Sequence, residues 1–322
     1  MKFLDLFAGI GGFRLGMESA GHECIGFCEI DKFARTSYKA IHDTTGEVEM
    51  HDITTISDEF IRGIGSVDVI CGGFPCQAFS IAGKRKGFED TRGTLFFEIA
   101  RFASILRPRY LFLENVKGLL NHEGGATFET ILRALDELGY DVEWQVLNSK
   151  DYVPQNRERV FIIGHLRGER TRKVFPFKKN DRTFTKLQGQ QIYANTLTTR
   201  IEAQGTGTYV VEREQHEEMF TLTAQDKHGV AIIQKSRGYN DGGIYKVAPT
   251  VTSNSWHENN FLKDSIRIRK LTPRECWRLQ GFPDWAFDKA KEVNSDSQLY
   301  KQAGNSVTVP VIADIASRLE SE

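Results

Sequence analysis

The sequence lacks the features that would place a protein in a membrane or send it out of the cell. None of its apolar runs approaches the roughly 18–20 residues that a membrane-spanning helix needs. The first residues, MKFLDLFAG, contain no basic segment followed by an apolar segment, as a secretory signal would. We therefore expect a cytoplasmic protein without a membrane partner.

Cysteine is scarce as well. The chain has five cysteines, which is an odd number, and no two of them form a Cys-x-x-Cys pair. A disulfide framework or a structural zinc site would need paired cysteines. We therefore expect no disulfides and no metal site.

Neither sign of charge dominates the sequence. Its 42 Lys and Arg residues balance 43 Asp and Glu residues, which leaves a net charge of −1. Composition alone therefore gives no sign of nucleic-acid binding. Residues 151–190 nevertheless contain ten Lys and Arg against four Asp and Glu. This basic sector fits either a face that binds a polyanion or an ordinary solvated face.

The first 165 residues or so alternate between strand-like and helix-like patterns. The short apolar runs KFLDLF, ECIGFC, VDVIC, YLFLEN and RVFIIG look like buried strands, and residues 127–139 carry apolar side chains at helical spacing. Such alternation predicts an α/β fold of the Rossmann type, with a mostly parallel sheet covered by helices on both faces.

The pattern changes after about residue 178, where helical periodicity gives way to Gly, Thr, Asn and Gln. We interpret residues 181–284 as a second, smaller, strand-rich domain; the alternative is a long irregular insertion. Helical pattern returns near the C-terminus, and the last helix is too short to be stable alone. The first domain is therefore expected to combine residues 1–180 with 301–322, with a hinge at 285–300.

A glycine turn, DLFAGIGGFRLG, follows the first strand directly. Gly9 and Gly11 permit close backbone approach to a ligand, although Arg14 stands where a dinucleotide-binding fingerprint has its third glycine. Glu29 ends the second strand, where its carboxylate can accept hydrogen bonds from ribose, and Asp52 follows the third. This arrangement predicts an adenosine-containing ligand.

Reactive side chains follow two later strands. Cys76, preceded by Pro75, comes just after one strand and Glu114 ends the next, so a thiol and a carboxyl meet in one crevice. Arg157 and Arg159 lie two residues apart before another strand, so they point to one face. Together these groups can add a nucleophile to a ring, protonate the ring and hold its carbonyl. Cys71, inside its strand, is interpreted as a small buried hydrophobe.

These segments together resemble the cytosine-5 DNA methyltransferase family, in particular its bacterial restriction-modification type. The matching motifs are DLFAGIGGFR, GGFPCQAFS, ENVKG, QNRER, LTPRECWRLQGFP and QAGNSV, and they occur in the family's order. The resemblance implies a fold that binds S-adenosylmethionine, methyl transfer to C5 of cytosine, and a cell that is bacterial or infected by a phage. It also implies a monomer acting on double-stranded DNA, and a cognate restriction endonuclease as a possible partner.

The resemblance also assigns roles to individual residues. Cys76 adds to C6 of cytosine, Glu114 protonates N3, and Arg159, together with Arg157, holds the O2 side of a base that has swung out of the duplex. Donor-binding positions match Phe7, Gly9, Gly11, Glu29, Ile30, Asp52, Ile53, Pro75, Leu95, Asn305 and Ser306. Residues 181–284 become the target-recognition domain. The DNA-binding candidates are Lys84, Arg85 and Lys86 in a hinged loop after the thiol, and Arg237 and Thr250 in that domain.

Three alternatives remain open. An RNA cytosine-5 methyltransferase of the same fold is the first; the large variable region and the Pro-Cys-Gln sequence favour DNA. A catalytically silent nucleic-acid-binding module is the second, although it would be expected to have lost Cys76 or Glu114. An NAD-dependent dehydrogenase is the third, and the broken glycine fingerprint argues against it.

Overall fold

The computed structural model of the chain describes residues 1–75, 95–177 and 271–319 in full. Between residues 178 and 270 it describes the backbone of six short strands: β8 (Val210–Val211), β9 (Phe220–Thr221), β10 (Ala231–Gln234), β11 (Gly243–Tyr245), β12 (Asn260–Lys263) and β13 (Ile268–Lys270). Four of these strands form an antiparallel sheet in the order β11-β10-β12-β13.

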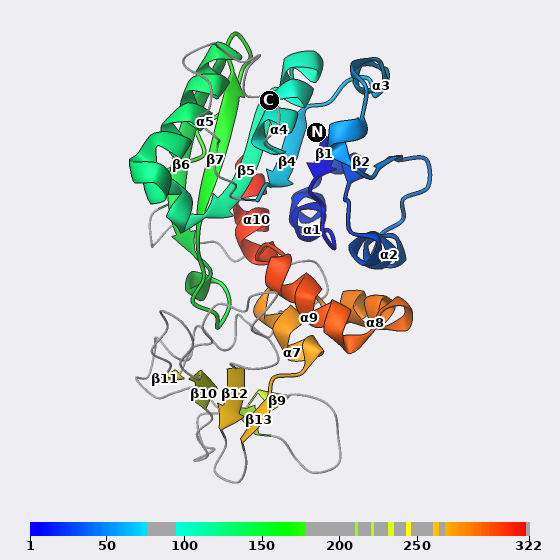
Figure 1. The fold of residues 1–322 in the computed structure, drawn as a ribbon, viewed down its shortest axis with the longest axis vertical. Coiled ribbons are helices and arrows are strands. Elements are labelled where there is room, and N and C mark those ends of the chain that lie inside the picture. Colours follow the sequence, from blue (N-terminus) through cyan, green and yellow to red (C-terminus); the bar gives the residue numbers. More distant parts are fainter. Residues whose placement is uncertain are drawn as a thin grey trace.

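A seven-stranded sheet forms the centre of the first part of the chain (Figure 1). Its strands are β1 (Lys2–Leu6), β2 (Glu23–Cys28), β3 (Val48–Met50), β4 (Val69–Gly73), β5 (Tyr110–Val116), β6 (Tyr140–Asn148) and β7 (Glu158–Leu166). They lie in the order β3-β2-β1-β4-β5-β7-β6. β1 to β5 pair in parallel, and β7 runs antiparallel to both of its neighbours. The predicted α/β fold with a mostly parallel sheet is confirmed.

Helices cover both faces of this sheet because successive strand residues point to opposite sides. They are α1 (Gly12–Ser19), α2 (Lys32–Ile41), α3 (Asp58–Gly63), α4 (Leu95–Leu106) and α5 (Ala126–Glu137), with short 3₁₀ turns η1 (Ile53–Thr55), η2 (Lys117–Gly125) and η3 (Ser149–Asp151). In β1, Leu4 belongs to the core on the α4 and α5 side. Phe3 belongs to the core on the opposite side, with Phe13 of α1.

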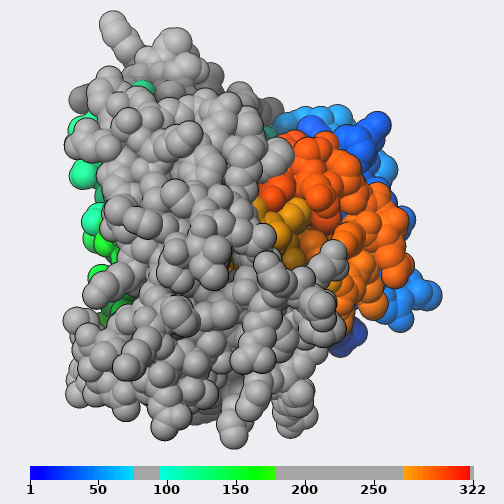
Figure 2. All heavy atoms as spheres, turned by 90° about the horizontal axis from the view of Figure 1, so that it is seen from below, coloured from blue at the N-terminus to red at the C-terminus, as the bar shows by residue number. Residues whose placement is uncertain are grey.

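Four helices follow the strand-rich region: α7 (Pro273–Leu279), α8 (Asp284–Val293), α9 (Asp296–Asn305) and α10 (Val309–Ala316). Ile312 of α10 lies against α1 so closely that a Cβ on Gly16 would be 2.6 Å from it. Trp277, Phe287 and Leu299 form a core with Ile10 and Ile41 from the N-terminal part. In Figure 2 the C-terminal helices, orange to red, lie against N-terminal residues in blue.

These contacts can be compared with the domain organisation that the sequence predicts. The range 285–300, predicted as a hinge, lies in α8 and the first half of α9, and α8 packs on α2. The strands between residues 210 and 270 agree with the predicted strand-rich character of that region. The domain boundaries themselves stay a prediction, as does a separate target-recognition domain. No helix among the described residues is long and apolar enough to cross a membrane.

Candidate active site

A pocket of about 440 Å³ opens at the edge of the sheet where β1, β2, β4 and β5 end. Its volume lies within the range of about 300–1,000 Å³ that is usual for small-molecule sites. The carboxyl edge of a parallel sheet is also the usual place for a ligand in such folds. Of the predicted site residues, eight line it: Phe7, Gly9, Glu29, Pro75, Glu114, Arg157, Arg159 and Asn305. The pocket thus joins predicted donor-binding and catalytic residues.

The turn after β1 adopts left-handed backbone conformations. Phe7 has a φ of 57°, Gly9 of 56° and Gly11 of 83°, and for Phe7 this conformation is strained. A Cβ on Gly9 would meet nothing within 4 Å, whereas a Cβ on Gly11 would lie 2.1 Å from Nε2 of His42. Gly9 therefore leaves room in the pocket, and Gly11 leaves room for a buried side chain beneath the turn.

The Glu29 carboxylate is fixed by two backbone amides. Gly9 N donates to its Oε2 at 2.7 Å and Asp31 N donates to its Oε1 at 2.8 Å. Burial raises the pKa of Glu29, and these two hydrogen bonds offset part of that effect. An ionised carboxylate offers about four lone-pair directions, so two amides leave acceptor capacity for hydroxyl groups in the pocket.

Six predicted donor-binding residues do not line the pocket. Ile30 is 69% exposed and Ile53 is buried. Leu95 begins α4, Gly11 is the N-cap of α1, and Ser306 follows α9. Asp52 caps η1 by accepting hydrogen bonds from Thr54 N and Thr54 Oγ1, which lower the pKa of Asp52.

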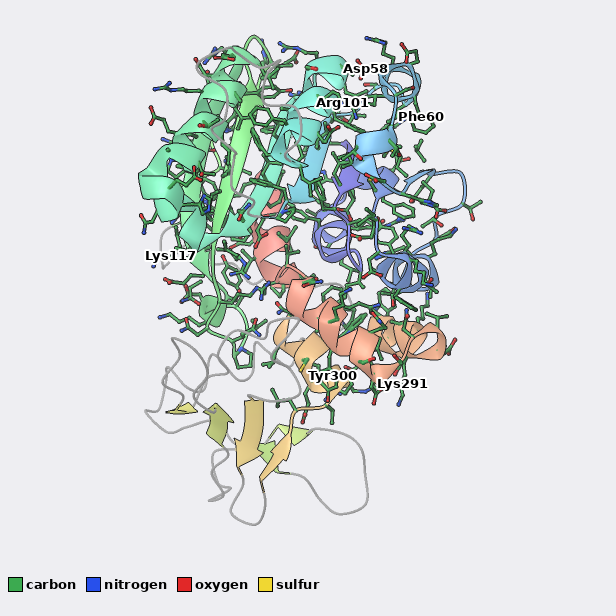
Figure 3. All side chains as sticks on the ribbon, viewed as in Figure 1. Asp58, Phe60, Arg101, Lys117, Lys291 and Tyr300 are labelled. Atoms are coloured by element: carbon green, nitrogen blue, oxygen red, sulfur yellow. The ribbon has the colours of Figure 1, made fainter. Side chains whose placement is uncertain are left out.

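Arg101 fixes the backbone around Ile53. Its guanidinium donates to Ile53 O at 3.1 Å, to Ile56 O at 2.8 Å and to Asp58 Oδ1 at 2.8 Å. Figure 3 shows Arg101 on α4 and Asp58 at the start of α3, in the upper part of the view. The segment after β3 is therefore tied to α4, the first described element after residue 75.

Glu114 and Arg159 form an ion pair in the pocket. Glu114 is buried near the end of β5, and Arg159 Nε lies 2.8 Å from Glu114 Oε1. A Cβ on Gly73 would lie 3.1 Å from Glu114 Oε2, so the glycine at the end of β4 leaves space for the carboxyl. The pair brings together a carboxyl group and a fixed cation. The carboxyl group, when it carries a proton, can donate that proton to a polar ring while the cation holds the ring.

Arg157 also lines the pocket but has different partners. Its guanidinium is buried and donates to Ser306 O at 2.8 Å and to Gly304 O at 3.3 Å. Burial and the nearby charge of Arg159 lower the pKa of Arg157 to about 9, so Arg157 stays protonated at neutral pH. Arg157 thus supports the C-terminal end of α9, which contains Asn305, and the start of the turn that follows it.

Asn115 lines the pocket, although the sequence patterns offered no reason to assign it a role. Its Nδ2 donates to Phe74 O at 2.9 Å in a buried hydrogen bond. Asn115 therefore fixes the backbone at Phe74, two residues before Cys76 in the sequence. The only signal in the sequence was the position of Asn115 next to Glu114, at the carboxyl end of a strand.

Several predicted residues lie outside the described part of the chain. These are Cys76, Lys84, Arg85, Lys86, Arg237 and Thr250. Cys71 is described: it is fully buried in β4, and burial raises the pKa of its thiol well above the ordinary value. Its interpretation as a packing residue is confirmed.

His42 beneath the glycine turn should make folding sensitive to acid. Burial lowers the pKa of His42 to about 3, from about 6.5 in an unfolded chain. Between these values the unfolded state binds more protons, so stability falls as the pH falls. We expect His42 to account for a loss of about 2 kcal/mol between pH 7 and pH 5.

Urea unfolding at both pH values measures this contribution. His42→Gln, which does not titrate, should lose correspondingly less stability than the unmodified protein between pH 7 and pH 5. The quantity compared is the change in unfolding free energy between pH 7 and pH 5. Packing that the substitution removes lowers stability equally at both pH values and cancels in this difference. An identical loss in the two proteins would show that His42 does not titrate between the states.

Comparison with known protein sequences agrees with the motifs. The profile of a family described as C-5 cytosine-specific DNA methylase matches residues 1–321. The Type II methyltransferase M.HpaII of Haemophilus parainfluenzae is 40% identical over 331 residues, covering 96% of this chain and 86% of the relative. The Type II methyltransferase M.HhaI of Haemophilus parahaemolyticus is 37% identical over 344 residues, covering 100% of this chain and 94% of the relative.

Solved structures share the fold. The Dnmt2 methyltransferase of S. pombe superposes with a TM-score of 0.64 at 19% identity, over 98% of this chain and 97% of the other. A putative DNA modification methyltransferase encoded within an E. coli prophage gives a TM-score of 0.61 at 21% identity, over 98% and 97% of the two chains. At such identities the likeness concerns the fold alone, and it agrees with the sheet described above.

Proposed function

The chain belongs to the C-5 cytosine-specific DNA methylase family, and from this premise we propose that it methylates C5 of a specific cytosine in duplex DNA, with S-adenosylmethionine as donor. Membership makes it an enzyme, and the predicted resemblance to the restriction-modification type is confirmed. The observation that carries the proposal is the single pocket that joins Gly9 and Glu29 to Glu114 and Arg159.

The residues around Glu29 fit the proposed donor. S-adenosylmethionine contains a ribose, and the Glu29 carboxylate has acceptor capacity beyond its two backbone amides. The open space at Gly9 and the left-handed turn at Phe7 suit a ligand that lies close to the backbone. Pro75 and Asn305 line the same pocket. When bound, the donor supplies an electrophilic methyl group on a sulfonium.

The proposed donor site includes further residues that do not line the pocket. Gly11, Ile30, Asp52, Ile53, Leu95 and Ser306 are assigned by their match to family motifs. Arg101 fixes the backbone carbonyl of Ile53 and thereby the segment around it.

Three side chains act on the cytosine ring in this proposal. C5 of cytosine is a poor nucleophile, so the Cys76 thiolate first adds to C6 while Glu114 delivers a proton to N3. The Arg159 guanidinium, held beside Glu114 by their ion pair, contacts the O2 side of the ring. C5 then carries electron density and accepts the methyl group. Loss of the C5 proton, departure of the thiolate and return of the N3 proton to the Glu114 carboxylate restore the ring.

Access to C6 requires the base to leave the helix. In a duplex, C6 lies within the base stack, so the target nucleotide must swing out to reach the buried Glu114. Lys84, Arg85 and Lys86 are proposed to contact phosphates during this step, and Arg237 and Thr250 are proposed to contact the target site. A monomer, a cytoplasmic location and a cognate endonuclease belong to the same proposal.

Methyl transfer from labelled S-adenosylmethionine tests the function directly. Duplex DNA from an unmodified host should accept the label, and nucleoside analysis should find it in 5-methylcytosine. Labelling of tRNA but not of DNA would replace the proposal by the RNA alternative. Labelling of neither would favour a silent binding module.

A mechanism-based trap tests the covalent step. In the presence of S-adenosylmethionine, duplex DNA with 5-fluorocytosine at the target position should form a denaturation-resistant adduct. After methyl transfer the fluorine at C5 cannot leave as a proton does, so the thiolate cannot be eliminated. Cys76→Ala should abolish the adduct, and Cys71→Ala, which changes the buried cysteine of β4, should retain it. An adduct that persists in Cys76→Ala would refute the assignment of the nucleophile.

A further inference from the structure

An ion pair joins two distant segments of the chain at the pocket. Lys301 Nζ of α9 lies 2.6 Å from Asp31 Oδ2, which precedes α2, and the two residues are 270 positions apart. Both residues line the pocket. The N-terminal and C-terminal parts of the pocket wall are therefore connected by this charge pair.

Asp31 is also the direct support of Glu29. Its backbone N–H donates to Glu29 Oε1, while its own Oδ1 accepts hydrogen bonds from Phe33 N and Ala34 N and so caps α2. Lys301 uses the other carboxylate oxygen. The position of the Asp31 backbone, and with it the Glu29 carboxylate, therefore depends on contacts from both α2 and α9.

The charges of Lys301 and Asp31 also affect the electrostatics at Glu29. The carboxylate of Asp31 repels that of Glu29 and contributes to the raised pKa of Glu29, after burial as the main cause. Partial burial raises the pKa of Asp31, but the contact with Lys301 and the two amides outweigh it, so the pKa is lowered. The ammonium group of Lys301 thus compensates one of two adjacent negative charges.

Other contacts hold α9 on α2 without Lys301. Gln302 accepts a hydrogen bond from Ser37 Oγ at 3.0 Å and donates to Phe33 O at 3.2 Å. Asn294 Nδ2 donates to the same carbonyl at 2.9 Å. Removal of the Lys301 charge should therefore leave the packing of the two helices in place.

We propose that Lys301 is a positioning residue for the donor-binding carboxylate Glu29, acting through Asp31. The inference rests on the proposed function, because it requires a ribose at Glu29. Lys301 touches Asp31 and fixes the residue whose amide orients Glu29. An ordinary partly exposed ion pair would affect stability by at most about 1 kcal/mol and would leave ligand affinity unchanged.

Calorimetric binding of S-adenosylhomocysteine, the demethylated donor, provides the first test. Lys301→Met should weaken binding about fivefold, and Lys301→Arg should restore most of it. Lys39→Met is the matched control: Lys39 pairs with Glu49 at 2.7 Å with similar side-chain exposure (48% and 32%, against 45% and 26% for Lys301 and Asp31). It should bind like the unmodified protein, and both Met variants should unfold at similar temperatures.

The ribose hydroxyls provide a readout that a purely structural role would not change. The 2′,3′-dideoxy analogue of S-adenosylhomocysteine should bind the unmodified protein more weakly than the parent ligand. In Lys301→Met this difference should shrink, because Glu29 is no longer well placed to accept the hydroxyls. An equal loss for both ligands would overturn the role of Glu29, and no loss for either would overturn the role of Lys301. Failure of the unmodified protein to bind S-adenosylhomocysteine would instead refute the proposed donor.

Discussion

Glu114→Gln should lower the rate of methyl transfer by roughly 10²–10⁴-fold, the usual contribution of a general acid. Glutamine keeps the shape of the side chain and an oxygen that can accept the hydrogen bond from Arg159. It cannot deliver a proton to N3 of the base, so addition of the thiolate to C6 would build up negative charge on the ring. Single-turnover methylation of duplex DNA with saturating donor measures the chemical step.

Glu158→Gln supplies the matched control for this substitution. Glu158 lies next to Arg159 and pairs with Lys117 at 2.9 Å, but this ion pair is exposed. The control should keep the rate of methyl transfer within about twofold, because an exposed pair contributes little. DNA affinity, measured separately, should change little in Glu114→Gln. If Glu114→Gln turned over at nearly the normal rate, proton delivery by this residue would not be needed.

Local patterns in the sequence were sufficient to predict the sheet and the edge at which the pocket lies. Apolar runs of five or six residues identified buried strands, and the end of each run placed Glu29 and Glu114 at the carboxyl edge. The antiparallel direction of β7 could not be obtained in this way. Strand direction depends on how the chain returns to the sheet, and apolar content is the same for either direction.

Arg157, immediately before β7, and Arg159, within it, show what the spacing of side chains in a sequence cannot predict. Their separation by two residues predicted that both point to one face, and both line the pocket. It could not reveal that Arg157 donates to Ser306 O, 149 positions away, while Arg159 pairs with Glu114. Partners so distant in the sequence are set by tertiary packing, and the same limit applies to the contact of Lys301 with Asp31.

Gly11→Ala should destabilise the protein by about 2–5 kcal/mol, far more than a typical surface substitution. Alanine in the left-handed conformation at a φ of 83° costs about 1–2 kcal/mol. Its Cβ would also lie 2.1 Å from Nε2 of buried His42, and such overpacking costs about 1–3 kcal/mol more. The free energy of unfolding in urea at pH 7.5, where His42 is neutral in both states, measures the sum.

Gly9→Ala separates the cost of the left-handed backbone from the cost of the clash with His42. Gly9 also has a positive φ, of 56°, but a Cβ there would meet nothing within 4 Å, so only the backbone cost applies. The double variant Gly11→Ala/His42→Ala should lose less unfolding free energy than the two single variants lose together, because removal of the His42 ring makes room for the alanine Cβ. Equal destabilisation by Gly9→Ala and Gly11→Ala would contradict a clash with His42.

The same three variants assign different functions to the two glycines. Gly9 lines the pocket and its own amide donates to Glu29, so Gly9→Ala should weaken S-adenosylhomocysteine binding more than it destabilises the fold. A methyl group on Gly11 projects toward His42 and the core below the turn. Donor affinity in Gly11→Ala/His42→Ala should therefore recover together with stability. If affinity stayed low while stability recovered, Gly11 would itself contact the donor, as the motif alone predicts.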